Sequence, residues 1–507
     1  MNPLILRGIR ERLRVKHLIA AGLFSLIVTS TVYFTAYLNE ANGGWSYNPQ
    51  TGEMEQDDPS PIKGARHAFT FLLSLQGFYL MFLGTGRVAA ITAEEKESGL
   101  MDYQRMTPMN PFSKILGYLF GLPAKEYYMF ALTIPFLLHC VIVGEIAFEN
   151  ILHLYFVFFS SVVLYHLTAH VIGLVVPKPR AASWVSRIVV LGLYVFLPAF
   201  GQAGISFLSF LTILPTYFGK MLPELISMEN SEFHRWEDDM IDFWQDVPFF
   251  ATEIPPSLFT LIMQGLILGA LLITAYRKWR NESLPAFSKT SGVIIFAVFQ
   301  FLLLGSLWPF FSEGKASGLL GENFSLAEAN GNEDGIFILL FVQSVFFGLS
   351  ILGLLTLVNT CCPDRHLHLK GVQRANRLGL SSIPVTADES RGTWFVLTLS
   401  AMVCGVHGFL LSQAVATDLF FSIKPELTAF YLPSLLVIAC ALYLQAAREL
   451  WFSLGFWGFV GLLWITPLLV SLVLAVGWQD DFLDMIAMLS SLCPVLATPQ
   501  ILGSQYD

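Results

Sequence analysis

The run HLIAAGLFSLIVTSTVYFTAYL, residues 17–38, contains no Asp, Glu, Lys or Arg. A helix needs roughly 20 apolar residues to cross the hydrocarbon core of a bilayer. This stretch therefore predicts a transmembrane helix, and similar runs follow it along the chain. The composition agrees, because only 13% of the 507 residues are charged, about half the roughly 25% of an average soluble domain.

Twelve spans are predicted. They cover about residues 17–38, 68–91, 118–145, 150–176, 184–214, 254–276, 290–311, 335–360, 395–413, 427–447, 452–477 and 482–499. The runs lack the short alternating pattern of an outer-membrane barrel, and a helix satisfies its backbone hydrogen bonds internally. The predicted fold class is therefore all-α, a polytopic integral membrane protein with two sets of six helices.

The orientation follows from the basic residues, which favour cytoplasmic loops. With the N-terminus placed in the cytoplasm, most of the 29 Lys and Arg residues fall on the cytoplasmic side. We expect a multi-pass protein of the cytoplasmic (inner) membrane. The chain divides near 280–289 into residues 1–290, with six spans, and a second six-span region, 291–507. That second region is either a degenerate repeat or an accessory.

The segment NPLILRGIRERLRVK, residues 2–16, predicts an amphipathic helix at the membrane interface. Leu6, Ile9 and Leu13 share one helical face. The opposite face carries three cations, Arg7, Arg10 and Arg14. Such a helix places its cations near anionic head groups, although an ordinary basic flank of a span would have the same composition.

The loop after the second span reads ITAEEKESGLMDYQRMTPMNPFSKILG, residues 91–117. Its acidic run, Glu94, Glu95 and Glu97, ends at Gly99. A short helix is expected from there to Met106, because Thr107-Pro108 disfavours helical backbone. The segment 92–114 is thus either a short rigid helix at the cytoplasmic face or an ordinary charged hairpin.

Both segments resemble those of ABC-2 type permeases, the membrane-spanning subunits of ABC transporters. The start NPLILRGIRERLR is similar to their interfacial helix, and EEKESGLMDYQRMTPMNPFSKILG is similar to their coupling loop. The resemblance covers about residues 1–290. It implies an exporter whose coupling loop, 92–114, docks on a separate ATP-binding subunit. The residues that match the loop are Glu94, Glu95, Glu97, Gly99, Thr107 and Pro108.

The chain lacks the G-x-x-x-x-G-K-[ST] phosphate-binding loop. We therefore expect it not to be an enzyme and to hold no cofactor, with ATP and Mg bound by the partner subunit. If both halves are transmembrane domains, one chain forms the pore; otherwise a second copy of the chain is required. Nothing in the sequence indicates nucleic-acid binding.

Two other groups of residues leave different functions open. His166 and His170 lie one helical turn apart in the fourth span, where they could form an intramembrane polar site, relay protons in an ion-coupled secondary transporter, or pack between helices. An intramembrane enzyme or a membrane scaffold is a further alternative. The cluster Cys361, Cys362, His366 and His368 could bind zinc, but its basic loop could equally rest on anionic lipid or be a degenerate second coupling element.

Overall fold

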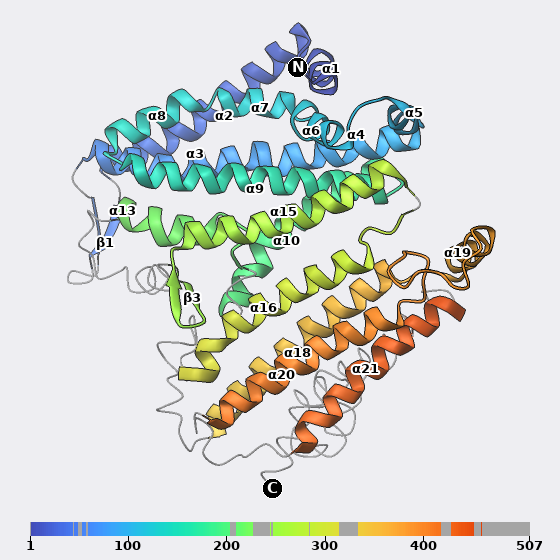
Figure 1. Cartoon of the computed structure of the whole chain (residues 1–507). Coiled ribbons are helices and arrows are strands. Elements are labelled where there is room, and N and C mark those ends of the chain that lie inside the picture. The colour runs from blue at the N-terminus through green and yellow to red at the C-terminus, as the bar shows by residue number, and fades with distance from the viewer. Residues whose placement is uncertain are drawn as a thin grey trace. The chain divides into compact units, whose positions relative to one another are not determined.

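The computed structural model describes residues 2–43, 45–48, 53–56, 59–202, 209–226, 244, 247–282, 284–313, 333–416, 427–450 and 458. Almost all of them are helical (Figure 1). The rest are loops, among them residues 378–392, and two short hairpins. The hairpins are formed by β1 (Trp45–Asn48) with β2 (Glu53–Gln56), and by β3 (Val247–Phe249) with β4 (Thr252–Ile254).

The chain forms two compact units. The first comprises residues 1–200, 208–247 and 253–282. Its elements are α1 (Pro3–Arg12), α2 (Val15–Ala41), α3 (Pro61–Gly77), η1 (Phe78–Gly84), α4 (Thr85–Glu97), α5 (Leu100–Met106), α6 (Pro111–Gly121), α7 (Ala124–Ala131), α8 (Ile134–Val143), α9 (Phe148–Val175), α10 (Pro179–Gln202), α12 (Leu214–Thr216), η2 (Tyr217–Met221), α13 (Leu222–Ile226) and α15 (Pro256–Arg280). Within this unit α2 packs on α3, and α9 packs on both α4 and α15 (Figure 1).

The second unit comprises residues 201–207, 248–252 and 283–507. Its long helices are α16 (Lys289–Glu313), α18 (Glu333–Cys361), α20 (Thr393–Ala416) and α21 (Leu427–Leu450), with the shorter α19 (Arg365–Arg377) between α18 and α20. Helix α20 packs on α16 and α21, and α18 also contacts both of these helices.

Seven described helices are long and apolar enough to cross a membrane, or eight if the bent pair of α18 and α19 is one span. A helical, multi-pass membrane protein is therefore confirmed. The prediction of twelve spans goes beyond what the structure describes. Segments 184–214 and 427–447 are not among the seven, and the latter contains only a shorter apolar helix, Ser434–Arg448. Segments 452–477, apart from residue 458, and 482–499 lie outside the described residues.

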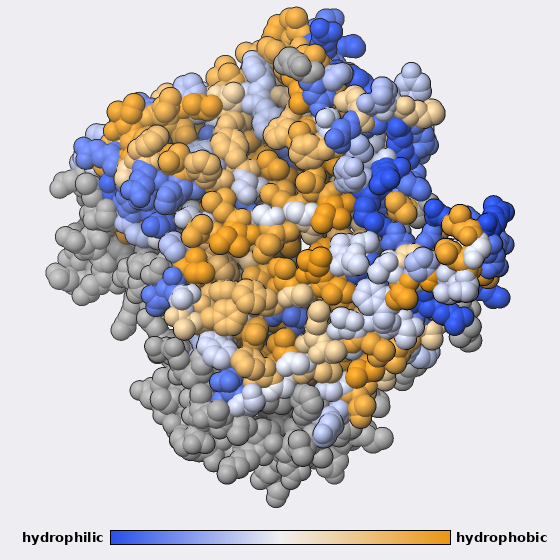
Figure 2. Space-filling model, in the orientation of Figure 1, coloured by the Kyte–Doolittle hydropathy of each residue, from blue (hydrophilic) through white to orange (hydrophobic). Residues whose placement is uncertain are grey.

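Apolar side chains cover much of the described surface over the long helices, as expected where lipid is the solvent (Figure 2). Ile142, Phe156 and Ile188 are among them, each more than half exposed. Hydrophilic residues gather over α19 and around the α4–α5 turn (Figure 2).

Candidate functional site

Helix α5 is a seven-residue element whose two ends are set by the local sequence. Gly99 has φ 74°, a left-handed conformation that is unfavourable for residues with a Cβ. At the other end Thr107 is extended, and its hydroxyl donates to the Gln104 carbonyl over 2.6 Å. Asn110 then caps α6 by accepting a hydrogen bond from the Phe112 amide. The helix predicted between Gly99 and Thr107-Pro108 is present.

Only one of the three predicted glutamates is buried. Glu95 is 7% exposed, whereas Glu94 and Glu97 are exposed. The Glu95 carboxylate accepts hydrogen bonds from Gln104 Nε2 at 3.1 Å and from the Tyr118 hydroxyl. That hydroxyl also lies 2.8 Å from Gln104 Oε1. The carboxylate thus joins α4, α5 and α6 in one buried polar cluster.

Arg7 connects the N-terminal helix to this cluster. Its Nη2 lies 3.1 Å from Glu95 Oε1, so it makes a charge-assisted hydrogen bond. Helices α1 and α6 approach each other closely here, because Gly8 lies against the backbone of Gly121, where an added Cβ would clash. Arg10 and Arg14 are exposed. Of the three arginines predicted at the membrane interface, Arg7 therefore belongs to the site around α5.

Lys114 caps the C-terminal end of α5 from inside the protein. It is 3% exposed, and its Nζ donates to the carbonyl oxygens of Gln104 at 2.7 Å and Thr107 at 3.3 Å. The same ammonium lies 5.7 Å from the centre of the Trp279 ring, a distance suited to a cation–π interaction. Lysine near a helix C-terminus also interacts favourably with the helix dipole.

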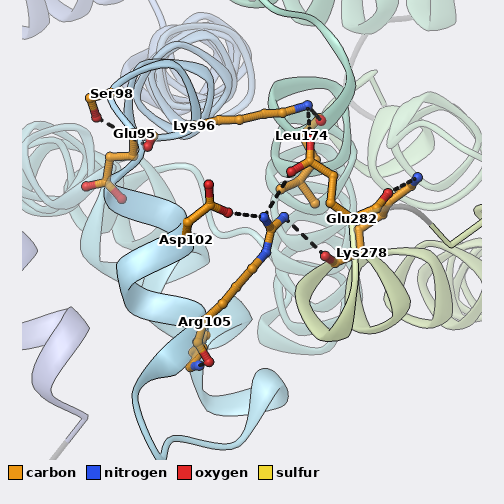
Figure 3. A network of polar contacts seen from close by, with 9 residues as sticks. Glu95, Lys96, Ser98, Asp102, Arg105, Leu174, Lys278 and Glu282 are labelled. Atoms are coloured by element: carbon orange, nitrogen blue, oxygen red, sulfur yellow. Dashed lines mark hydrogen bonds and ion pairs between the residues drawn. The ribbon is translucent and has the colours of Figure 1, made fainter.

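A second polar junction fixes α5 to the ends of α9 and α15 (Figure 3). Arg105 points toward Glu282 and contacts it at 3.0 Å, and it also donates to the Lys278 carbonyl. Lys96 contacts Glu282 at 3.0 Å and donates to the Leu174 carbonyl at 2.6 Å. The hydrogen bonds from Lys96 and Arg105 lower the pKa of Glu282, because they favour the charged carboxylate.

The outer face of α5 carries apolar side chains. Tyr103 is 66% exposed and Met106 is 78% exposed. On the inner face Met101 is buried in an apolar cluster with Ile115, Leu119 and Trp279. The helix is thus held on one side and presents a partly apolar surface on the other.

His170 is fully buried and lies beside the polar cluster of Glu95, Gln104 and Tyr118. Its Nε2 accepts from Trp279 Nε1 at 2.8 Å, and its Nδ1 lies 3.1 Å from the Thr92 hydroxyl. An indole N–H can only donate, so Nε2 carries no proton and the ring is neutral in this arrangement. His170 also packs on Tyr118, which contacts Glu95, so two separately predicted sites are continuous.

His166 lies one turn away and is also fully buried. Its Nε2 lies 3.0 Å from the Leu80 carbonyl, which can only accept, so Nε2 carries the proton. Leu80 belongs to η1, a π-helical segment, and such segments are frequent at functional sites. Tyr127 lies 3.3 Å from the other ring nitrogen. Both histidines are therefore hydrogen-bonded between helices.

An apolar cavity of about 530 Å³ also lies within the first unit. Both π-helical segments line it, through Phe78 and Met81 of η1 and Tyr217 and Phe218 of η2. Thr70 and Tyr217 share a hydrogen bond of 2.8 Å in its wall. The cavity is large enough for a small ligand.

The four residues considered for zinc do not form a ligand set. Within the described part of the chain, no three His, Cys, Asp or Glu side chains are placed to hold a metal ion. Cys361 and Cys362 are buried, His366 is exposed, and His368 Nδ1 lies 2.9 Å from the Glu389 carbonyl.

Several central residues of the site were not predicted: Gln104, Lys114, Tyr118, Trp279 and Glu282. Gln104 follows Met101 by three residues, so the helical period could have placed both on the buried face. Lys114 and Tyr118 follow within 14 residues of Gln104, whereas Trp279 and Glu282 come from a distant part of the chain. No protein-family model matches the chain, and no curated protein or solved structure matches it either.

Proposed function

We propose that this chain is the membrane-spanning permease subunit of an ABC transporter, an exporter driven by a separate ATP-binding subunit that docks on α5. The observation that carries the proposal is the two-sided nature of α5. On one side, buried Gln104 donates to Glu95 of α4, which also contacts Tyr118 of α6 and Arg7 of α1, and Arg105 donates to the end of α15. The other side exposes Tyr103 and Met106.

This arrangement suits the transmission of a movement. A partner that pushed on Tyr103 and Met106 would displace α5, and the Arg105 and Glu282 contact would carry the displacement to the ends of α9 and α15. Closely packed helices transmit such a shift because a protein core moves between distinct packing arrangements and does not deform gradually. In this proposal Glu95 and Gly99 shape the lever, while the exposed residues contact the partner.

The apolar cavity beside η1 and η2 supports a transport function for the first unit. In the proposed orientation the N-terminus and α5 face the cytoplasm, and the membrane is the cytoplasmic (inner) membrane. ATP and Mg would be bound by the partner, which the missing phosphate-binding loop requires.

An ion-coupled secondary transporter is the alternative, with His166 or His170 carrying protons. The hydrogen bonds of His170 disfavour it, because Trp279 must lose its acceptor whenever that ring nitrogen is protonated. A role as a membrane scaffold or intramembrane enzyme has no comparable geometric support among the described residues.

The test is purification of the tagged chain in mild detergent from its native host, with identification of bound proteins and assay of ATP hydrolysis. The double variant Tyr103→Ala/Met106→Ala should recover at least roughly tenfold less ATP-binding subunit, since exposed anchors dominate interfaces. Leu378→Ala/Val385→Ala is the matched control, because these residues are also apolar and exposed, at 65% and 60%.

Recovery of no ATPase, under conditions that preserve other membrane complexes, would overturn the proposal. If the control lost the ATPase and the α5 variant kept it, the docking element would be assigned wrongly. The mass of the recovered complex would distinguish one copy of the chain from two.

A further inference from the structure

A cavity of about 490 Å³ lies within the second unit, between α19 and residues 381–394. Its polar lining includes His368, Asn376, Ser381, Ser382 and Arg391. Val372, Ile383 and Trp394 provide apolar walls. The volume falls in the range of ligand pockets, roughly 300–1,000 Å³, and the lining suits a ligand with one anionic and one apolar part.

The cavity lies at the mouth of a membrane span. Thr393 begins α20, whose residues Thr393–Leu410 are long and apolar enough to cross a bilayer. Arg391 lies two residues before that helix, and Trp394 is in its first turn. Tryptophan is enriched where spans meet the head-group layer. The cavity is thus at the depth of lipid head groups.

The surface around the cavity is basic. Helix α19 carries four cations and no acid: Arg365, Lys370, Arg374 and Arg377. The last three follow each other at four and three residues, so they share one helical face, and all are exposed. Glu389 lies 3.5 Å from Arg374, whose side chain nevertheless stays 74% exposed. Each cation near a membrane surface attracts anionic lipid by about 1 kcal/mol.

Hydrogen bonds to backbone carbonyls hold the cavity wall in place. Lys289 donates to the carbonyl oxygens of Ala387 at 2.7 Å and Asp388 at 3.0 Å. The Ser390 hydroxyl and the Trp394 indole both donate to the Val385 carbonyl. A site with fixed walls loses less conformational entropy when a ligand binds.

We propose that this cavity binds the phosphate-bearing head group of an anionic phospholipid, with Arg391 as its cationic partner and Ser381 and Ser382 as neutral donors. The location at the start of α20 selects a lipid over a soluble phosphate. The charge on α19 selects an anionic lipid over a zwitterionic one.

The test is lipid retention by the purified full chain, measured by native mass spectrometry after titration with phosphatidylglycerol or phosphatidylcholine. The expected result is preferential retention of phosphatidylglycerol, reduced about tenfold in Arg391→Gln because one charge-assisted contact is lost. Arg365→Gln is the control, since it removes the same charge from an exposed position that does not line the cavity. A smaller reduction, of no more than about fivefold, is expected from the loss of one surface cation.

Ser382→Trp fills the cavity without changing the charge and should also lose the lipid, which keeps the test valid if Arg391→Gln fails to fold. Equal retention of the two lipids would overturn the proposal, as would equal effects of the Arg391 and Arg365 variants. Displacement of the lipid by millimolar inorganic phosphate would assign the site to a soluble phosphate, and would overturn it too.

Discussion

Each unit has a surface turn whose backbone is held by a buried lysine. In the first unit Lys114 lies behind α5, and in the second Lys289 lies behind the segment 381–394. Both are nearly inaccessible, at 3% and 0% exposed, and both donate to backbone carbonyls of the turn that they close. The turns differ in what surrounds the lysine. In the first unit a buried carboxylate, Glu95, is also present, whereas in the second unit the acid paired with a cation of α19 is Glu389, whose side chain is 25% exposed.

The difference shows two ways to build a turn beside a membrane. Around α5 the buried charges of Glu95 and Lys114 lie inside and fix the helix to its neighbours, and the apolar residues Tyr103 and Met106 face outward. Around α19 the cations face outward, and hydrogen bonds from Lys289 and Ser390 to backbone carbonyls hold the cavity wall in place. The first arrangement suits a protein partner and the second an anionic lipid.

Removing the buried carboxylate is expected to have the largest effect. Glu95→Ala should lower the free energy of unfolding by about 2–3 kcal/mol, because the buried Gln104 amide and Tyr118 hydroxyl lose their charged acceptor. Unfolding by SDS in mixed micelles measures the change.

The matched controls are Glu97→Ala, an exposed residue of α4, and Glu389→Ala of the second turn. The former should change stability by less than about 0.5 kcal/mol, and the latter by less than about 1 kcal/mol. Equal losses for Glu95 and Glu389 would remove the distinction between the two turns.

Exchanging each lysine tests whether the turns are closed independently. Lys114→Met should cost about 1–2 kcal/mol and expose the chain to trypsin after Arg105, since the α5 carbonyls lose their donor. Lys289→Met should instead increase cleavage after Arg391. Limited proteolysis with mass spectrometry locates the cuts, because cleavage reports local opening. If either variant opened both turns equally, independent closure would be wrong.

The sequence predicted the parts of this comparison that depend on local backbone chemistry. Gly99 and Thr107-Pro108 bound α5 because glycine can adopt the left-handed conformation at one end, and Pro108 disfavours helical backbone at Thr107 at the other. The long apolar runs form helices because a helix satisfies its backbone hydrogen bonds internally in lipid, and the runs lack the alternating pattern of a barrel. Each of these structures is determined by residues that are close together in the sequence.

The partners within the site could not be predicted in this way. Three glutamates lie within one turn, and only the exact rotation of α4 decides that Glu95 is the buried one. Its partners Arg7 and Tyr118 lie 88 and 23 residues away along the chain. Contacts of this kind depend on helix packing, which leaves little trace in a single sequence.

The smallest expected effect concerns pH. Hydrogen bonds from Lys96 and Arg105 lower the folded-state pKa of Glu282. The carboxylate therefore adds stability above its unfolded-state pKa, near 4.5, and this contribution is lost as pH falls through the folded-state value. Its side chain is 47% exposed, so solvent limits the contribution to less than about 1 kcal/mol.

The measurement is amide hydrogen exchange of residues 97–110 between pH 7 and pH 4, because trypsin is inactive at low pH. The rates are corrected for the pH dependence of intrinsic exchange. Protection of α5 should weaken toward pH 4, and Glu282→Gln should already be weakened at pH 7 and change little further. Residues 381–392 take part in none of the described contacts of Glu282, although Glu389 pairs with Arg374, and they serve as the internal reference. If both turns lost protection in parallel in the parent and the variant, Glu282 would not be the group that couples α5 to the ends of α9 and α15.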